Sequence, residues 1–142
     1  MKTKQLLIVV MFLFASAAPV PADNHAASIS SLRNRAVQGE ALAQLNLGIM
    51  YQSGQGVPQD YIEAYKRFNL AAAQGIALAQ VFLGLMYSEG QGVPQDYVQA
   101  HKWFNLAAAN SDKPDHHNLA VQSRDKLAAL MTPAQIAGSV SI

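Results

Sequence analysis

The chain has 142 residues, a formal net charge of +1 and no cysteine. The lack of cysteine excludes disulfides, thiolate metal sites and a lipid-modified cysteine. Residues 1–22 hold two of the basic residues and no acid, so residues 23–142 carry eight basic and nine acidic residues, a net charge of −1. That balance, with no basic stripe, argues against a nucleic-acid-binding protein. A chain of this length can bury enough apolar surface to fold without disulfides.

Residues 1–22 have the pattern of a secretory signal peptide. Lys2 and Lys4 make its start positive, and the apolar stretch 6–14 follows. A stretch this short does not span a bilayer, which takes about 20 residues. Cleavage is expected after Ala22, with cleavage after Ala17 as the alternative, and leaves no membrane span. An uncleaved membrane anchor is the rival interpretation.

Residues 23–142 are predicted to form one domain. After a short disordered lead at 23–28, residues 28–38 are predicted to form a helix. This helix aligns with the second half of the repeat described next, with Leu32 at the position of Phe68. The chain is therefore expected to begin with a half-repeat that caps the first full hairpin.

Residues 39–74 are repeated at 75–110, with 25 identities in 36 positions. A repeat of this length is typical of one helical hairpin per repeat. The first repeat is expected to have helices at 40–53 and 60–73, and the second repeats that plan. The fold class is therefore all-α, an α/α solenoid of antiparallel helix hairpins.

Six residues recur in the turn of each hairpin and are predicted to shape and cap it: Gly54, Gly56, Asp60, Gly90, Gly92 and Asp96. The first glycine of each turn follows a helix and suits a left-handed backbone conformation, which penalises other residues. Each aspartate precedes the next helix and is predicted to accept from its free amides as an N-cap.

The repeat breaks down after residue 110, where Lys126 stands at the position of Gly90. Residues 111–142 are predicted to form C-terminal capping helices. A longer helix is expected at 115–131, and Thr132 is expected to cap a short helix that starts at Pro133 and ends near residue 137.

Both repeats resemble the Sel-1-like repeat, a tetratricopeptide-like family. The first repeat has the pattern at Ala43, Leu47, Gly48, Tyr51, Gly54, Gly56, Val57, Asp60, Ala64, Phe68, Ala71, Ala72 and Gly75. The second has it at Ala79, Leu83, Gly84, Tyr87, Gly90, Gly92, Val93, Asp96, Ala100, Trp103, Phe104, Ala107 and Ala108. Two features depart from the family: Arg67 replaces the usual tryptophan, and only two complete repeats are present.

The resemblance implies an adaptor or scaffold that holds a partner protein or peptide on the concave face of the solenoid. It also implies a short bacterial member, secreted or held in the periplasm. A small regulator or inhibitor of an envelope enzyme or sensor is the alternative, and a weak hydrolase is a remote third.

No catalytic residue, metal site or cofactor is predicted. His116 and His117 are adjacent on a helix, so their side chains diverge, and the preferred interpretation is two solvated histidines. His101 is expected on the exposed side of its helix. Asp60 and Asp96 are explained by capping, and no serine lies in a nucleophile-elbow pattern.

The predicted binding face is a second apolar side of the first helix in each repeat. It consists of Leu42, Leu45, Asn46, Ile49, Leu78, Val81, Phe82 and Leu85. A helix that is apolar nearly all round must be covered by something. One interpretation is a groove for a partner helix or peptide, or for a second copy of this chain in a homodimer. The other is that neighbouring helices of the same chain fill the stripe.

Overall fold

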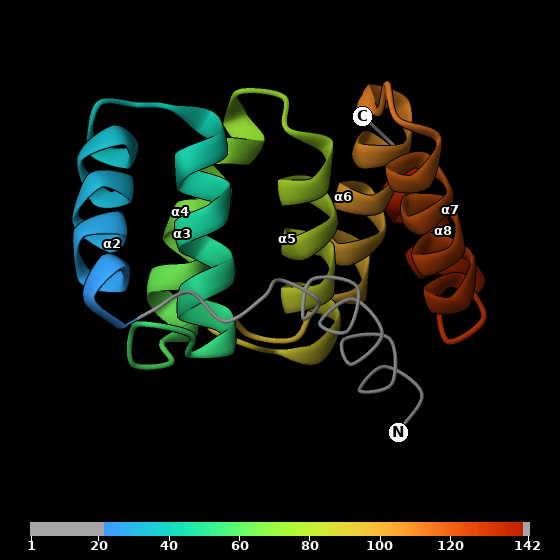
Figure 1. The fold of residues 1–142 in the computed structure, drawn as a ribbon. Helices are drawn as coiled ribbons and strands as arrows, with labels where there is room; N and C mark the ends of the chain where they lie inside the picture. The colour runs from blue at the N-terminus through green and yellow to red at the C-terminus, as the bar shows by residue number, and fades with distance from the viewer. Residues whose placement is uncertain (1–21, 141–142) are drawn as a thin grey trace.

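A row of helices runs from one end of the molecule to the other in chain order (Figure 1). The structure is a computed structural model that describes residues 22–140. These contain no strand and seven helices: α2 (Ala22–Val37), α3 (Ala41–Ser53), α4 (Tyr61–Ala73), α5 (Ala77–Glu89), α6 (Tyr97–Asn110), α7 (Pro114–Ala128) and α8 (Pro133–Val140). The predicted all-α solenoid is confirmed. Apart from Ala22, the predicted leader lies outside the described residues.

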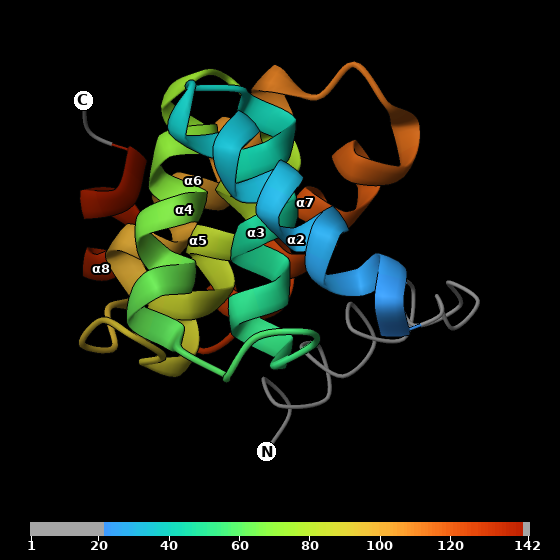
Figure 2. The same cartoon turned by 60° about the vertical axis from the view of Figure 1, so that its left-hand side comes forward.

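The two repeats fold as antiparallel hairpins, α3 with α4 and α5 with α6. Helix α2 packs on α3 at one end, and α7 and α8 both pack on α6 at the other (Figures 1 and 2).

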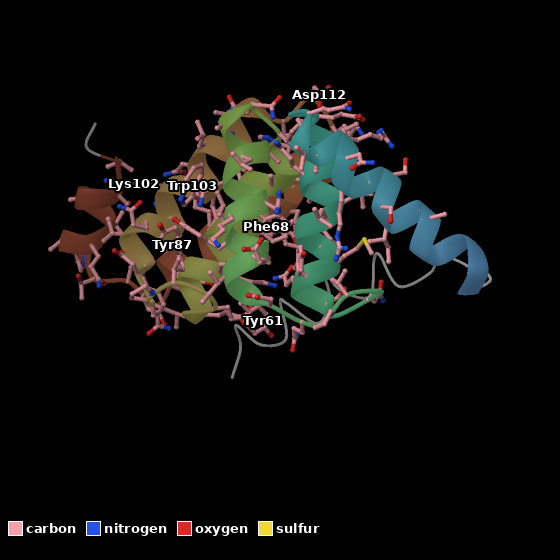
Figure 3. All side chains as sticks on the ribbon, turned by 90° about the vertical axis from the view of Figure 1, so that its left-hand side faces the viewer. Tyr61, Phe68, Tyr87, Lys102, Trp103 and Asp112 are labelled. Carbon is pink, nitrogen blue, oxygen red and sulfur yellow. The ribbon has the colours of Figure 1, made fainter. Side chains whose placement is uncertain are left out.

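In each hairpin, a glycine on the first helix leaves room for a phenylalanine ring of the second helix. A Cβ on Gly48 would lie 2.7 Å from the Phe68 ring, and one on Gly84 would lie 2.5 Å from the Phe104 ring. Phe68 lies in the middle of the first hairpin (Figure 3).

The turn chemistry predicted from the repeat is confirmed in both copies. Gly54 and Gly90 end their helices in the left-handed conformation, with φ of 73° and 69°, and Gly56 and Gly92 also have positive φ. The Asp60 side chain accepts from the Ile62 and Glu63 amides, and the Asp96 side chain accepts from the Gln99 amide.

Glutamine side chains join each hairpin to the helix before it. The Gln44 amide donates to the Ala36 carbonyl, and the Gln80 amide donates to the Ala72 carbonyl, both at 3.2 Å. At the third such junction, His117, one residue beyond the repeat register, donates from Nδ1 to the Ala108 carbonyl at 2.9 Å. The Ala36 and Ala72 carbonyls also accept from the backbone amides of Gly39 and Gly75, so each glutamine adds a second hydrogen bond at the C-terminus of the preceding helix. His117 is exposed, as expected, but it also has this structural role.

The helix boundaries differ from the prediction at the two ends. Helix α2 starts at Ala22 and takes in the residues expected as a disordered lead. Helix α7 ends at Ala128 and α8 continues to Val140, so the terminal pair is more evenly divided than expected. The predicted cap of α8 is present: Thr132 Oγ1 accepts from the Gln135 amide, and the Gln135 side chain accepts from the Thr132 amide. This reciprocal pair is a capping box.

Candidate interaction surface

The second-repeat half of the predicted binding face lies in the core. Leu78, Val81, Phe82 and Leu85 are all buried, with at most 5% of each residue exposed. The Phe82 ring stacks on Phe68 of α4, with centroids 4.7 Å apart and planes 4° apart. The expectation of an open groove over α5 is therefore corrected. Helices α4, α6 and α7 all pack on α5.

The first-repeat half of the same face is largely open. Leu42 is 57% exposed, Asn46 is exposed, and Ile49 and Met50 are half-buried. These four residues lie at i, i+4, i+7 and i+8 on one side of α3, and we name them the α3 strip. Leu45, predicted to belong to this face, is buried.

Helix α3 packs mainly on α2 and α4, whereas α5 packs on α4, α6 and α7. Leu32 and Ala36 of α2 pack against Ala43 and Leu47, which lie on a different side of α3. No described helix takes the place that the first helix of a preceding hairpin would have. The corresponding side of α5 is buried, so the difference between the two repeats comes from their neighbours.

Helix α2 itself has the character of an end cap. Ser28 and Arg35 are exposed where the repeat has the buried residues Ala64 and Ala71. Arg35 forms a two-pronged ion pair with Glu40, and the hydrogen bond with Arg35 lowers the pKa of Glu40. A polar outer face is what a terminal repeat needs in order to remain soluble. Exposed apolar side chains at this end are those of α3 together with Val37, the last residue of α2, which is 80% exposed.

A second set of exposed aliphatic residues lies on the other helix of each hairpin. Ile62 and Leu70 of α4 are 59% and 48% exposed, and Leu106 of α6, in register with Leu70, is 43% exposed. Sequence reasoning missed this set because these positions did not belong to the core stripe. Lys66 and Lys102 are also exposed on these helices. Single exposed aliphatic residues between lysines are common on protein surfaces.

His101 is buried, contrary to the expectation that it faces solvent. Helix α8 packs on α6, and Ser139 Oγ lies 2.8 Å from His101 Nδ1. The Ser139 hydroxyl also lies 2.6 Å from the Ile136 carbonyl, and Asn105 Nδ2 lies 3.2 Å from the same His101 nitrogen. Burial lowers the pKa of His101, and Arg124 of α7 lowers it further, while Asp125 acts in the opposite direction. The path of α8 over α6 was not evident in the repeat pattern.

The burial of His101 predicts that the fold weakens in mild acid. An unfolded histidine takes up a proton below about pH 6.5, whereas folded His101 has a lower pKa. Its contribution to stability is therefore complete above that pH and is lost as the pH falls toward the folded pKa. Thermal melts between about pH 7.5 and 5 should show a steeper loss in the wild type than in His101→Gln. The control variant His116→Gln should lose stability with pH as the wild type does. If the wild type and His101→Gln lost stability in parallel, the acid sensitivity would belong to another group.

The described residues give no sign of a catalytic or metal centre. Asp60 and Asp96 are occupied as helix caps. Within residues 22–140, no group of three or more histidine, aspartate or glutamate side chains could hold a metal ion. None of the helices described there is both long and apolar enough to cross a bilayer. The feature that stands out is the uncovered side of α3.

The helix order, the repeated turn and the glycine contacts define a solenoid of helical hairpin repeats. Residues 41–76 and 77–112 each match the family described as Sel1 repeat, and the chain belongs to this family. Sel1 repeats are generally non-catalytic and form protein–protein interaction modules. Comparison with curated proteins found no match.

Two solved structures have a similar fold. A protective antigen of uropathogenic Escherichia coli with an SLR fold is 31% identical, with a TM-score of 0.77, and the match covers 96% of this chain and 28% of that one. A Sel1 repeat protein from Oxalobacter formigenes is 26% identical, with a TM-score of 0.60, and the match covers 92% and 59%. The chain thus spans less than two thirds of either protein.

Proposed function

We propose that this chain is an exported interaction module that binds a helix of another polypeptide on the α3 strip. The observation that carries the proposal is the contrast between equivalent faces of α3 and α5. The α5 face is buried by packed helices, whereas the α3 face exposes Leu42 and Asn46. A helix side with this composition gains stability when another apolar helix side covers it.

Export is proposed from the leader alone. Its two lysines and short apolar stretch support secretion to the periplasm or the medium. The intact mass of the exported protein should correspond to a chain that starts at Asp23, or at Ala18 in the alternative. A full-length chain retained in the inner membrane would contradict export without affecting the interaction module.

The binding face can be tested with two matched leucine substitutions. Leu42→Asp changes the α3 strip, and Leu70→Asp changes a comparably exposed leucine on α4. Both should keep the wild-type circular dichroism and melting temperature, because exposed sites tolerate a charge. We expect Leu42→Asp to abolish association with a partner in pull-downs and light scattering, and Leu70→Asp to leave it intact. The reverse result would place the binding face on α4 and α6.

A further inference from the structure

We infer that the occupant of the α3 strip is the α3 strip of a second copy of this chain, with the two helices antiparallel about a twofold axis at Asn46. The inference rests on the proposed function, because it names the partner of the same surface. It begins from the order of residues along the strip. Leu42 lies four residues before Asn46, and Met50 lies four residues after it.

This order is symmetric about Asn46. In a twofold dimer, residue i of one copy meets residue j of the other, and the reverse contact also forms. An antiparallel pair of α3 helices centred on Asn46 therefore brings Leu42 of each copy opposite Met50 of the other. Asn46 meets Asn46, and Ile49 widens the apolar contact. Both ends of the strip are thus covered by apolar side chains.

The central amide suits a contact with itself. An asparagine side chain has both a donor and an acceptor, so two copies can exchange a pair of hydrogen bonds across the axis. If an apolar partner helix covered Asn46 instead, its amide would be left without hydrogen bonds. A single asparagine at the centre of a helix interface is a known means of fixing register and partner number.

The charges around the strip also favour a second copy. Helix α3 contains no acidic or basic residue, so two α3 helices meet without like-charge repulsion. Arg35 and Glu40, which precede α3 in the chain, are paired with each other. A partner selected by its charge would find no complementary charge on α3. The strip is therefore complementary to itself in both polarity and charge.

The second repeat shows that this side of the helix accepts a close helical neighbour. Residues of α5 in the same register are buried, and Phe82, at the position of Asn46, stacks on α4. The backbone geometry of the two first helices is the same, with matching ends and glycines at matching positions. The main change is the replacement of a core phenylalanine by an amide.

Sedimentation velocity of the processed, purified protein tests the inference. We expect a concentration-dependent equilibrium between monomer and dimer. Asn46→Asp places two carboxylates at the axis and should weaken the dimer about 100-fold. Asn118→Asp, the same change at an exposed site on α7, should leave the equilibrium unchanged. At concentrations where the wild type is monomeric, both variants should keep its melting temperature.

Cysteine cross-linking tests the axis without a change of charge. The chain has no cysteine of its own, so an Asn46→Cys variant exposed to oxidised glutathione should form a covalent dimer through that single position. Asn118→Cys should remain monomeric under the same conditions. Equal cross-linking of both variants, or a wild type that is monomeric at every concentration, would overturn the inference. If that monomer still binds another protein through Leu42, the proposed function stands and only the identity of its partner is rejected.

Discussion

Replacement of Phe82 by alanine should lower the free energy of unfolding by about 3–5 kcal/mol, which is the usual cost of removing a buried phenylalanine side chain. Phe82 is 2% exposed and stacks on Phe68 between the two repeats. The substitution therefore opens a cavity at the contact that joins one hairpin to the next. Urea denaturation followed by circular dichroism measures the loss.

Asn46→Ala is the matched control for Phe82→Ala, because Asn46 has the same register on α3 and is exposed. It should change the stability of the monomer by less than about 0.5 kcal/mol. If Phe82→Ala were equally mild, the α5 face would be accessible, as the sequence-based prediction of a groove required.

Gly92→Ala should be the most damaging of the turn substitutions. Gly92 has a φ of +72°, and a Cβ there would lie 2.5 Å from the backbone oxygen of Tyr61. The left-handed conformation costs an alanine about 1–2 kcal/mol. Crowding against a packed backbone adds a further cost of about 1–3 kcal/mol. Thermal or urea unfolding should therefore show a total loss of about 2–5 kcal/mol.

Gly75→Ala separates these two causes. Gly75 also has a positive φ, of +83°, but a Cβ there would meet no atom within 4 Å. Its loss should be limited to the conformational cost of about 1–2 kcal/mol. Equal losses at the two glycines would show that the contact between the second turn and Tyr61 is relaxed in solution.

The hairpin turns could be predicted from the sequence because their chemistry is local. Gly54 and Gly90 follow their helices directly, and Asp60 and Asp96 precede the next ones, so short-range sterics and capping determine the result. A repeat with 25 identities in 36 positions also shows the same local solution twice. The hairpins, their order and the cap at Thr132 followed from such signals.

The burial of α5 and His101 depends on tertiary neighbours and could not be predicted in the same way. Leu42 and Leu78 occupy the same position in nearly identical helices, yet one is 57% exposed and the other 5%. Helix α5 packs on α4, α6 and α7, whereas α3 packs mainly on α2 and α4. His101 is similarly covered by a helix far along the chain, through Ser139. A possible signal was Ser123, a small residue at the position of Tyr87, which breaks the repeat where the terminal helices pack.

The glutamine contacts between hairpins have a consequence for how such a chain can grow. Each first helix carries its own amide to hold the end of the helix before it, as Gln44 does for Ala36 and Gln80 for Ala72. An in-frame duplication of one 36-residue unit would therefore bring both its internal packing and its connection to the preceding unit. Such an event lengthens the solenoid without requiring a compensating mutation elsewhere. The number of units between the two ends would change, while the capping helices stayed the same. These helices carry Ser28 and Arg35 at one end and His117 at the other.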